Sequence, residues 1–188
     1  KDDLDLGYTT VTEHEIDTGD SKPIKLPPRR VPLAYAEAEL QLIKDMEKQG
    51  IIQKSYSPWA SPLNLVMKKN GKVRPCIDYR KVNDVTKNDA FPLPRIQDCL
   101  DAVAGASIFS TFDLTSGYHQ VPVKKSDVPK TAFITKYGLW EFLTMPMGLK
   151  GSAQTFQRTL QIILNGLQWQ TCLIYLDDII VLDQLSMT

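Results

Sequence analysis

Two adjacent carboxylates, Asp177 and Asp178, lie between two apolar segments near the end of the sequence. The segments Cys172 to Ile174 and Ile179 to Leu182 are typical of buried β-strands, so the two acids fall where a hairpin must turn. Like unit charges about 4 Å apart repel by roughly 4 kcal/mol at an effective dielectric near 20, and a divalent cation reverses that interaction. The pattern Tyr175-Leu176-Asp177-Asp178 therefore indicates a metal-dependent phosphoryl-transfer site.

A third carboxylate is needed to complete such a site, because two metal ions must be held about 3.5 to 4 Å apart. Asp113 is the best candidate, since it ends an apolar strand predicted from about Ser107 to Asp113. If that strand pairs with the hairpin, the three carboxylates meet at one edge of a sheet. The simpler alternatives stay open: Asp177 and Asp178 as ordinary turn residues, and Asp113 as a helix N-cap.

The N-terminal part of the chain predicts an extended lead-in followed by a helix. Residues 1–32 are acidic and then punctuated by prolines. Gly50 then ends a helix, and Ile51 to Ser61 is predicted as a loop. The apolar positions of this helix recur at helical spacing: Leu33, Ala36, Leu40, Ile43 and Met46.

Three β-hairpins are predicted. The alternating strand from Leu63 to Met67 and the strand from Val73 to Tyr79 flank Lys69-Asn70-Gly71-Lys72, whose Asn-Gly pair favours a tight turn. The segments 131–135 and 139–143 flank Lys136-Tyr137-Gly138. The carboxylate hairpin is the third. Mixed strands and helices with three hairpins predict an α+β fold, with an antiparallel sheet backed by helices.

Two further helices are predicted between these strands. The first has Pro94 in its first turn, carries Ile96, Cys99, Leu100 and Val103, and is closed by Gly105. The second is expected to be capped by Ser152 and weakened at its end by Gly166. Its expected apolar face is Ala153, Phe156, Leu160, Ile163 and Leu167.

Composition excludes several classes of site. The 188 residues are 43% hydrophobic, which is enough for a packed core, and no apolar run approaches the roughly 18 to 20 residues of a membrane span. The three cysteines, Cys76, Cys99 and Cys172, are scattered, which argues against disulfides or a zinc site and favours a reducing compartment. The two histidines, His14 and His119, stand apart. Any metal would therefore have oxygen ligands.

Charge is unevenly distributed although the net charge is zero. Residues 1–20 hold seven acids against Lys1 alone, so this segment is minus six and the remainder is plus six. Two basic groups stand out: Lys68, Lys69, Lys72, Arg74, Arg80 and Lys81, and then Lys124, Lys125, Lys130 and Lys136. Each group suits phosphate binding, and each is equally compatible with an ordinary solvated face.

Several ordered motifs resemble one enzyme family. The first four are Ser57-Pro58-Trp59-Ala60-Ser61-Pro62, Lys68-Lys69-Asn70-Gly71-Lys72-Val73-Arg74, Asp78-Tyr79-Arg80-Lys81-Val82-Asn83 and Phe91-Pro92-Leu93-Pro94. The next are Phe112-Asp113-Leu114-Thr115-Ser116-Gly117-Tyr118-His119-Gln120, Lys130-Thr131-Ala132-Phe133, Met145-Pro146-Met147-Gly148-Leu149 and Tyr175-Leu176-Asp177-Asp178. From about His14 to Val181 the chain resembles the reverse transcriptases of long-terminal-repeat retrotransposons, most closely the gypsy-type class, with retroviral enzymes more distant.

The resemblance implies an RNA-directed DNA polymerase with a right-hand fold. Fingers would span about 33–105 and palm about 106–188, after the lead-in at 1–32. The catalytic carboxylates would be Asp113, Asp177 and Asp178, binding two Mg²⁺ with Mn²⁺ as a possible substitute, and Leu114 would belong to the metal site. The 3′ hydroxyl of a primer would attack the α-phosphate of a deoxynucleotide.

The resemblance also assigns substrate contacts. Lys72 and Arg74 would grip the incoming triphosphate, and Leu114 to Gly117 would offer backbone N–H groups to it. Tyr118 would lie beneath the sugar and disfavour a ribose 2′ hydroxyl, the alternative being a plain core aromatic. The nucleotide set is Lys72, Arg74, Thr115, Ser116, Gly117, Tyr118 and Met147. The template and primer set is Tyr175, Leu176, Gln154 and Gly148; core packing explains Ala153 and Phe156 more simply.

The sequence departs from the family pattern in two places. Met147 stands where gypsy-type members usually carry an aromatic residue and retroviral ones a polar amide. After Val181 the sequence diverges, and a thumb is expected to be absent, together with the other Pol polyprotein parts (protease, RNase H and integrase). Expected partners are an RNA or DNA template with its primer and deoxynucleoside triphosphates, with no membrane. The alternative hypothesis is a truncated retroelement remnant that only binds nucleic acid or protein.

Overall fold

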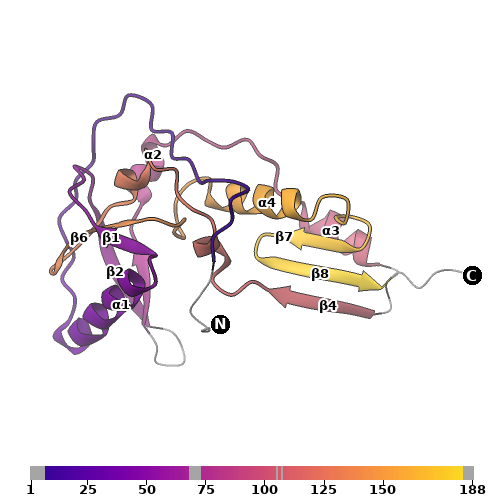
Figure 1. The fold of residues 1–188 in the computed structure, drawn as a ribbon, viewed down its shortest axis with the longest axis horizontal. Helices are drawn as coiled ribbons and strands as arrows, with labels where there is room; N and C mark the ends of the chain where they lie inside the picture. The colour runs from indigo at the N-terminus through magenta and orange to yellow at the C-terminus, as the bar shows by residue number, and fades with distance from the viewer. Residues whose placement is uncertain (1–6, 68–72, 105, 107, 184–188) are drawn as a thin grey trace, which may run out of the picture.

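The strands of the protein form two separate sheets. The computed structural model describes residues 7–67, 73–104, 106 and 108–183. Within them, one sheet has five strands in the order β1-β6-β5-β2-β3 and the other has three in the order β4-β8-β7. Figure 1 shows the three-stranded sheet at one end of the molecule, beneath α4, and the larger sheet at the other end. The α+β fold predicted from the sequence is confirmed.

The five-stranded sheet draws its strands from distant parts of the chain. They are β1 (Ile52–Lys54), β2 (Ser61–Met67), β3 (Val73–Ile77), β5 (Phe133–Thr135) and β6 (Gly138–Phe142). All neighbours pair antiparallel except β2 and β5, which are parallel. The sheets therefore do not divide the chain at residue 105, because β5 and β6 come after it.

The hairpins β2–β3 and β5–β6 are confirmed, although the Lys69-Asn70-Gly71-Lys72 turn lies outside the described residues. The predicted loop from Ile51 to Ser61 is wrong at its start, since β1 occupies Ile52–Lys54. Ile52 is 2% exposed and pairs with Phe142. A three-residue strand leaves too little periodicity to be recognised, and only its distant partner defines it.

The three-stranded sheet contains the carboxylates. Its strands are β4 (Ile108–Asp113), β7 (Cys172–Tyr175) and β8 (Asp178–Asp183), all antiparallel, with β8 in the centre. The predicted strand ending at Asp113 and the predicted carboxylate hairpin are both confirmed. The expected burial holds for Cys172 to Ile174, but on the other side of the turn Val181 is 37% exposed.

The described residues form four α-helices: α1 (Ala36–Lys48), α2 (Arg80–Val85), α3 (Ile96–Val103) and α4 (Ser152–Ile163). Short 3-10 turns occur at Leu33–Tyr35, Gly117–Gln120 and Val128–Thr131. Three of the four α-helices match the sequence prediction, and α2 was not predicted. Its six residues are too few for a periodic signal.

Several details of the predicted helices are wrong. Pro94 precedes α3, which begins at Ile96 after its N-cap Arg95. On α4, the predicted apolar face holds for Phe156 and Leu160, but Ile163 is 52% exposed at the end of the helix and Leu167, 47% exposed, lies beyond it.

Leu33 is 87% exposed, because it lies in the 3-10 turn before α1 and not on the buried face that carries Ile43 and Met46. Ser152 is not the cap of α4: Gly151, with φ +86°, holds that position. The Ser152 hydroxyl instead donates a hydrogen bond to the Pro146 carbonyl oxygen. Gly fits there because a positive φ strains residues that carry a Cβ.

Apolar side chains form two clusters. The larger one joins α1 to the five-stranded sheet and includes Ile43, Tyr79 and Phe133. The smaller one lies between α4 and the three-stranded sheet, and its buried members are Val121, Met145, Phe156, Leu160, Cys172 and Ile174. Burial of Phe156 against β7 fixes α4 behind the carboxylate hairpin.

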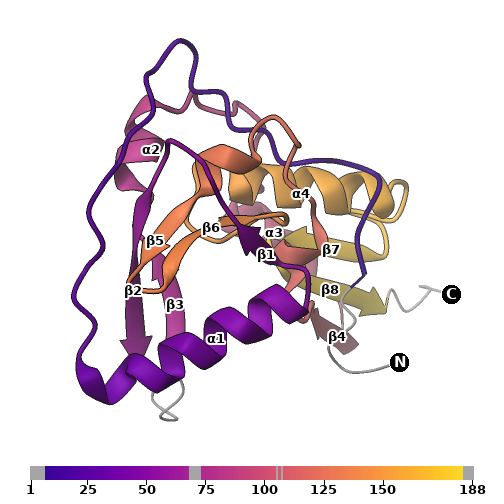
Figure 2. The ribbon, with the colours of Figure 1, turned by 60° about the vertical axis from the view of Figure 1, so that its left-hand side comes forward.

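The lead-in runs as an extended strap along the molecule (Figure 2). His14 forms an isolated bridge with Val123, and Lys25 forms one with Ala60. His14 and Ile16 are fully buried. The acids of this segment meet the basic groups noted in the sequence: Glu15 pairs with Lys124 at 3.1 Å. No helix within the described residues is long and apolar enough to cross a membrane.

Candidate active site

Asp113 and Asp178 are paired residues of adjacent strands. In the antiparallel register of β4 and β8, Asp113 lies opposite Asp178, and Tyr175 of β7 lies opposite Asp178 on its other side. Residues directly opposite each other point to the same face of a sheet. Asp177 lies in the turn between β7 and β8. Backbone pairing thus brings the three acids to one edge of the sheet.

The alternative role of Asp113 as a helix N-cap is excluded, since Ser116 is the residue that precedes the following 3-10 helix. Asp113 and Asp178 are exposed and Asp177 is half-buried. None of the salt bridges among the described residues involves these three carboxylates. Among the described residues, no cationic side chain therefore pairs with these charges.

Oxygen donors of this kind suit Mg²⁺, which binds through one or two carboxylates together with substrate phosphates. Over the described part of the chain, no three or more His, Cys, Asp or Glu side chains are gathered into a group that could hold an ion. The residue types and strand positions of the three carboxylates fit a magnesium site, although their side chains do not form a close cluster in this structure.

The turn that carries Asp177 is held from behind by a residue that sequence reasoning missed. Leu176 has φ +56°, a backbone conformation that residues with a Cβ rarely adopt. Its N–H donates to Oε1 of Gln157 on α4 at 2.8 Å, and Gln157 Nε2 donates to the Ile174 carbonyl oxygen at 3.1 Å. One signal was present: Gln157 is a polar residue next to Phe156, on the face of α4 that the sequence predicts to be apolar.

A pocket of about 260 Å³ lies between α1, the five-stranded sheet and the 3-10 turn Gly117–Gln120, and it brings together four of the predicted nucleotide residues: Arg74, Ser116, Tyr118 and Met147. Arg74, on β3, donates from Nη2 to the Met147 sulfur. The rest of the pocket wall is mostly apolar and consists of Leu42, Met46, Gln49, Ile51, Pro75, Ile77, His119, Phe142 and Pro146. A cation at the mouth of an apolar pocket suits a ligand with a phosphate and a less polar body.

Tyr118 links this pocket to the carboxylate turn. Its ring stacks on Phe156 with centroids 4.9 Å apart and planes 17° apart. Burial, and then the negative charge of Asp177, raise the pKa of the Tyr118 phenol. Gly117 allows this stacking, because a Cβ at that position would lie 2.6 Å from Phe156 Cζ. Tyr118 is thus both a packed aromatic and a pocket wall.

The other predicted residues have separate positions. Lys72 lies outside the described residues. The Gly117 N–H donates to the Leu114 carbonyl oxygen at 3.1 Å, and the Thr115 carbonyl accepts from Gln120. Leu114 packs against the smaller apolar cluster. Gly148 accepts a hydrogen bond at its carbonyl from Asn83 Nδ2 at 2.8 Å. Gln154, Tyr175 and Leu176 are half-buried on α4 and at the hairpin end.

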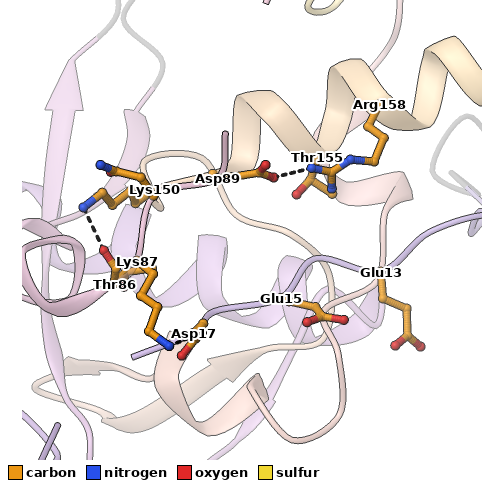
Figure 3. Close-up of a pocket in the computed structure, with 11 residues that line it drawn as sticks. Glu13, Glu15, Asp17, Thr86, Lys87, Asp89, Lys150, Thr155 and Arg158 are labelled. Atoms are coloured by element: carbon orange, nitrogen blue, oxygen red, sulfur yellow. Dashed lines mark hydrogen bonds and ion pairs between the residues drawn. The ribbon is translucent and has the colours of Figure 1, made fainter. Parts of the chain in front are cut away.

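A second pocket, of about 320 Å³, lies where the lead-in passes α4 (Figure 3). Its three cations are all engaged: Lys87 with Asp17, Arg158 with Asp89, and Lys150 with the Thr86 carbonyl oxygen. Figure 3 shows these contacts crossing between the lead-in, the segment after α2 and α4. This pocket is cross-linked by the protein's own charges, and it contains none of the predicted site residues.

The sequence is similar to those of known proteins. Residues 66–185 match the family model described as reverse transcriptase (RNA-dependent DNA polymerase). The Retrovirus-related Pol polyprotein from transposon 297 of Drosophila melanogaster is 39% identical over 184 residues, covering 94% of this chain and 17% of that protein. The corresponding polyprotein from transposon gypsy is 34% identical over 185 residues, covering 95% and 18%. The chain spans less than a fifth of these curated relatives.

Solved structures show the same fold. Prototype foamy virus protease-reverse transcriptase, in its selenomethionine-labelled CSH mutant, superposes with a TM-score of 0.86 at 23% identity, covering 96% of this chain and 24% of that one. A foamy viral protease-reverse transcriptase in complex with double-stranded DNA also gives 0.86, at 25% identity, covering 96% and 31%. The predicted fold of polymerase fingers and palm is confirmed by these similarities.

Proposed function

Because this chain belongs to the reverse transcriptase family, we propose that it adds deoxynucleotides to the 3′ hydroxyl of a primer on an RNA or DNA template, by two-metal phosphoryl transfer. The observation that carries the proposal is the pairing of Asp113 with Asp178 across β4 and β8, with Asp177 in the adjoining turn. A foamy viral relative has been solved with an RNA/DNA hybrid, which supports the same class of partner for this chain.

Asp113, Asp177 and Asp178 would hold the metal ions, with Leu114 contributing beside Asp113. Bound there, two Mg²⁺ would activate the attacking oxygen and stabilise the leaving oxygen. The strands supply the ligands from a rigid frame, because β8 is hydrogen-bonded on both sides. Mn²⁺ would be accepted as well, since it also prefers oxygen ligands.

Arg74 would bind the phosphates of the incoming nucleotide. Its guanidinium is always charged and can offset charge that develops on phosphate oxygens. Lys72, two residues before it, would add a second cation. Ser116, with φ +50°, lines the pocket with Tyr118 and would contribute backbone groups to the same phosphates, together with Thr115. The Gly117 N–H already donates to the Leu114 carbonyl oxygen, so Gly117 would shape the turn and not donate to phosphate.

Tyr118 would select the sugar. Because its ring is stacked on Phe156, it cannot easily yield to a ribose 2′ hydroxyl. Met147 faces Arg74 and would pack against the base or sugar of the bound nucleotide. Gln154, Gly148, Tyr175 and Leu176 would lie along the template and primer, near the ends of α4 and β7.

Primer extension on an RNA template with Mg²⁺ tests the proposal directly. The unchanged chain should extend the primer, and Asp177→Asn should abolish extension. Asp101→Asn is the matched control, because Asp101 is an exposed carboxylate on α3. Equal extension by the unchanged chain and Asp177→Asn would refute the metal-site assignment. Template binding without extension by either would instead support a nucleic-acid-binding remnant.

A further inference from the structure

Gln157 is a buried amide among apolar neighbours. It lies in α4 beside Phe156, and its side chain is 0% exposed. The smaller apolar cluster, which contains its neighbour Phe156, also includes Leu160 of α4 and Cys172 and Ile174 of β7. A polar side chain in such a place must find partners inside the protein, because water does not reach it.

Both partners of Gln157 are backbone groups of the carboxylate hairpin. Its Nε2 donates to the Ile174 carbonyl oxygen at 3.1 Å, and its Oε1 accepts from the Leu176 N–H at 2.8 Å. These two groups lie on either side of Tyr175, at the point where β7 ends. The side-chain amide of Gln157 therefore joins the end of the strand, at Ile174, to the first residue of the turn, Leu176.

The turn needs such support. Leu176 is a non-glycine residue at φ +56°, and glycine would normally be expected at a position with positive φ. The conformation of Leu176 sets the direction in which the following residue, Asp177, leaves the backbone. A strained backbone persists only where the surrounding structure holds it. The hydrogen bond from the Leu176 N–H to Gln157 is such a constraint.

We infer that Gln157 is a positioning residue of the metal site: its side-chain amide fixes the backbone of Leu176 and thereby the placement of the Asp177 carboxylate. This inference depends on the proposed function, since it assigns a role toward the metal ligands. A purely structural role would be to fasten α4 to β7. The two roles differ in what Gln157 changes, because only the first affects the affinity of the carboxylates for a divalent ion.

Gln157→Met removes both hydrogen bonds at nearly constant volume. Gln161→Met is the matched control, since Gln161 is a half-buried glutamine on the same helix, one turn further. Two readouts need no polymerase activity: exchange of the Leu176 amide hydrogen, and binding of Mn²⁺ measured by electron paramagnetic resonance. In Gln157→Met we expect faster exchange at Leu176 and Mn²⁺ affinity lower by about tenfold or more, as for other outer partners of metal ligands.

A second change separates turn geometry from general packing. Leu176→Gly, introduced into the Gln157→Met chain, lets the turn adopt a positive φ without strain. We expect it to recover a large part of the lost Mn²⁺ affinity. Recovery would tie the effect of Gln157 to the backbone of Leu176, whereas no recovery would contradict the inference. A Gln157→Met chain that does not fold, with either residue at position 176, would make Gln157 a residue of the fold and overturn the assignment.

Asp177→Asn distinguishes the inference from the function on which it depends. If Asp177→Asn weakens Mn²⁺ binding and Gln157→Met weakens it no more than Gln161→Met does, the metal site is supported and the positioning role of Gln157 is refuted. If the unchanged chain binds no Mn²⁺ at these residues, both the proposed metal site and the role of Gln157 are refuted.

Discussion

Asp113 lies directly opposite Asp178 across the β4–β8 pair, so two acidic side chains occupy the same face of the sheet. Like charges in this position destabilise a sheet. No salt bridge within the described residues offsets either charge. The opposed charges thus destabilise the folded state, and a bound cation would relieve their repulsion.

Removing one of these charges should stabilise the metal-free protein. We expect Asp178→Asn to raise the free energy of unfolding by about 0.5 kcal/mol without divalent ions, because a directly opposed like-charge pair is relieved. Added Mg²⁺ should stabilise the unchanged chain and not the variant. Denaturant unfolding with and without Mg²⁺ measures both effects; Asp101→Asn, which opposes no acid across a strand, is the control. Equal stabilisation of both proteins by Mg²⁺ would contradict a site at these residues.

Tyr118 should govern the choice between deoxyribonucleotides and ribonucleotides. Truncation in Tyr118→Ala removes the ring that is stacked on Phe156, and we expect relative ribonucleotide incorporation to rise by about tenfold or more, within the range of steric discrimination. Tyr118→Phe keeps the ring and should keep the preference. Single-nucleotide primer extension with each substrate gives the ratio. A similar ratio in Tyr118→Ala and the unchanged chain would leave Tyr118 a packing residue only.

Arg74 should act on nucleotide binding more than on template binding. We expect Arg74→Ala to raise the KM for the deoxynucleotide by about tenfold, because charge-assisted hydrogen bonds to phosphate contribute about 1.5 to 3 kcal/mol. Arg74→Lys should be intermediate, since it keeps the charge and loses the planar fork. Steady-state extension gives the KM, and a filter-binding measurement of template affinity should be little changed. A loss confined to template affinity would move Arg74 out of the nucleotide site.

Gly117 should not tolerate a side chain. A Cβ at position 117 would lie 2.6 Å from Phe156 Cζ, in a buried contact. We expect Gly117→Ala to destabilise the protein by about 1 to 3 kcal/mol, as overpacking does. Phe156→Leu in the same chain should recover part of that loss, although it creates a cost of its own. Denaturant midpoints of the single and double variants test the coupling, and strict additivity would contradict it.

Stability should fall as pH is lowered from about 6.5 toward 4. Burial lowers the pKa of His14 to about 4 in the folded protein, below its ordinary value of 6.5, so the unfolded chain takes up the proton first. Below about pH 4 the resulting loss of folding stability is complete, at roughly 3 kcal/mol, and above about pH 6.5 it is absent. Burial lowers the pKa of His119 in the same direction.

Unfolding by denaturant at several pH values measures this slope. His14→Gln keeps a polar group near Thr155, to which His14 Nδ1 is hydrogen-bonded at 3.0 Å, and removes the titration. The pH dependence between 6.5 and 4 should become shallower in this variant. An unchanged slope would show that other groups carry the acid sensitivity.

Local patterns were sufficient for most of the strands and helices. The Asn-Gly pair, the Lys136-Tyr137-Gly138 turn and the carboxylate pair each lie between apolar segments, and these neighbours alone favour a hairpin. Short elements were missed for a physical reason: Ile52–Lys54 and Arg80–Val85 carry too few residues for periodicity. Their formation depends on partners far away, such as Phe142 for Ile52.

The sequence by itself determined the kinds of residues at the site: adjacent acids in a hairpin turn, a third acid at a strand end, and an aromatic beside a glycine. Only the tertiary structure decided that Asp113 faces Asp178, that Arg74 and Tyr118 line one pocket, and that Gln157 reaches the turn of Leu176. Hairpin turns and the longer strands follow from neighbours in sequence. Strand register and side-chain partners follow from packing between residues distant in the chain, which local patterns do not encode.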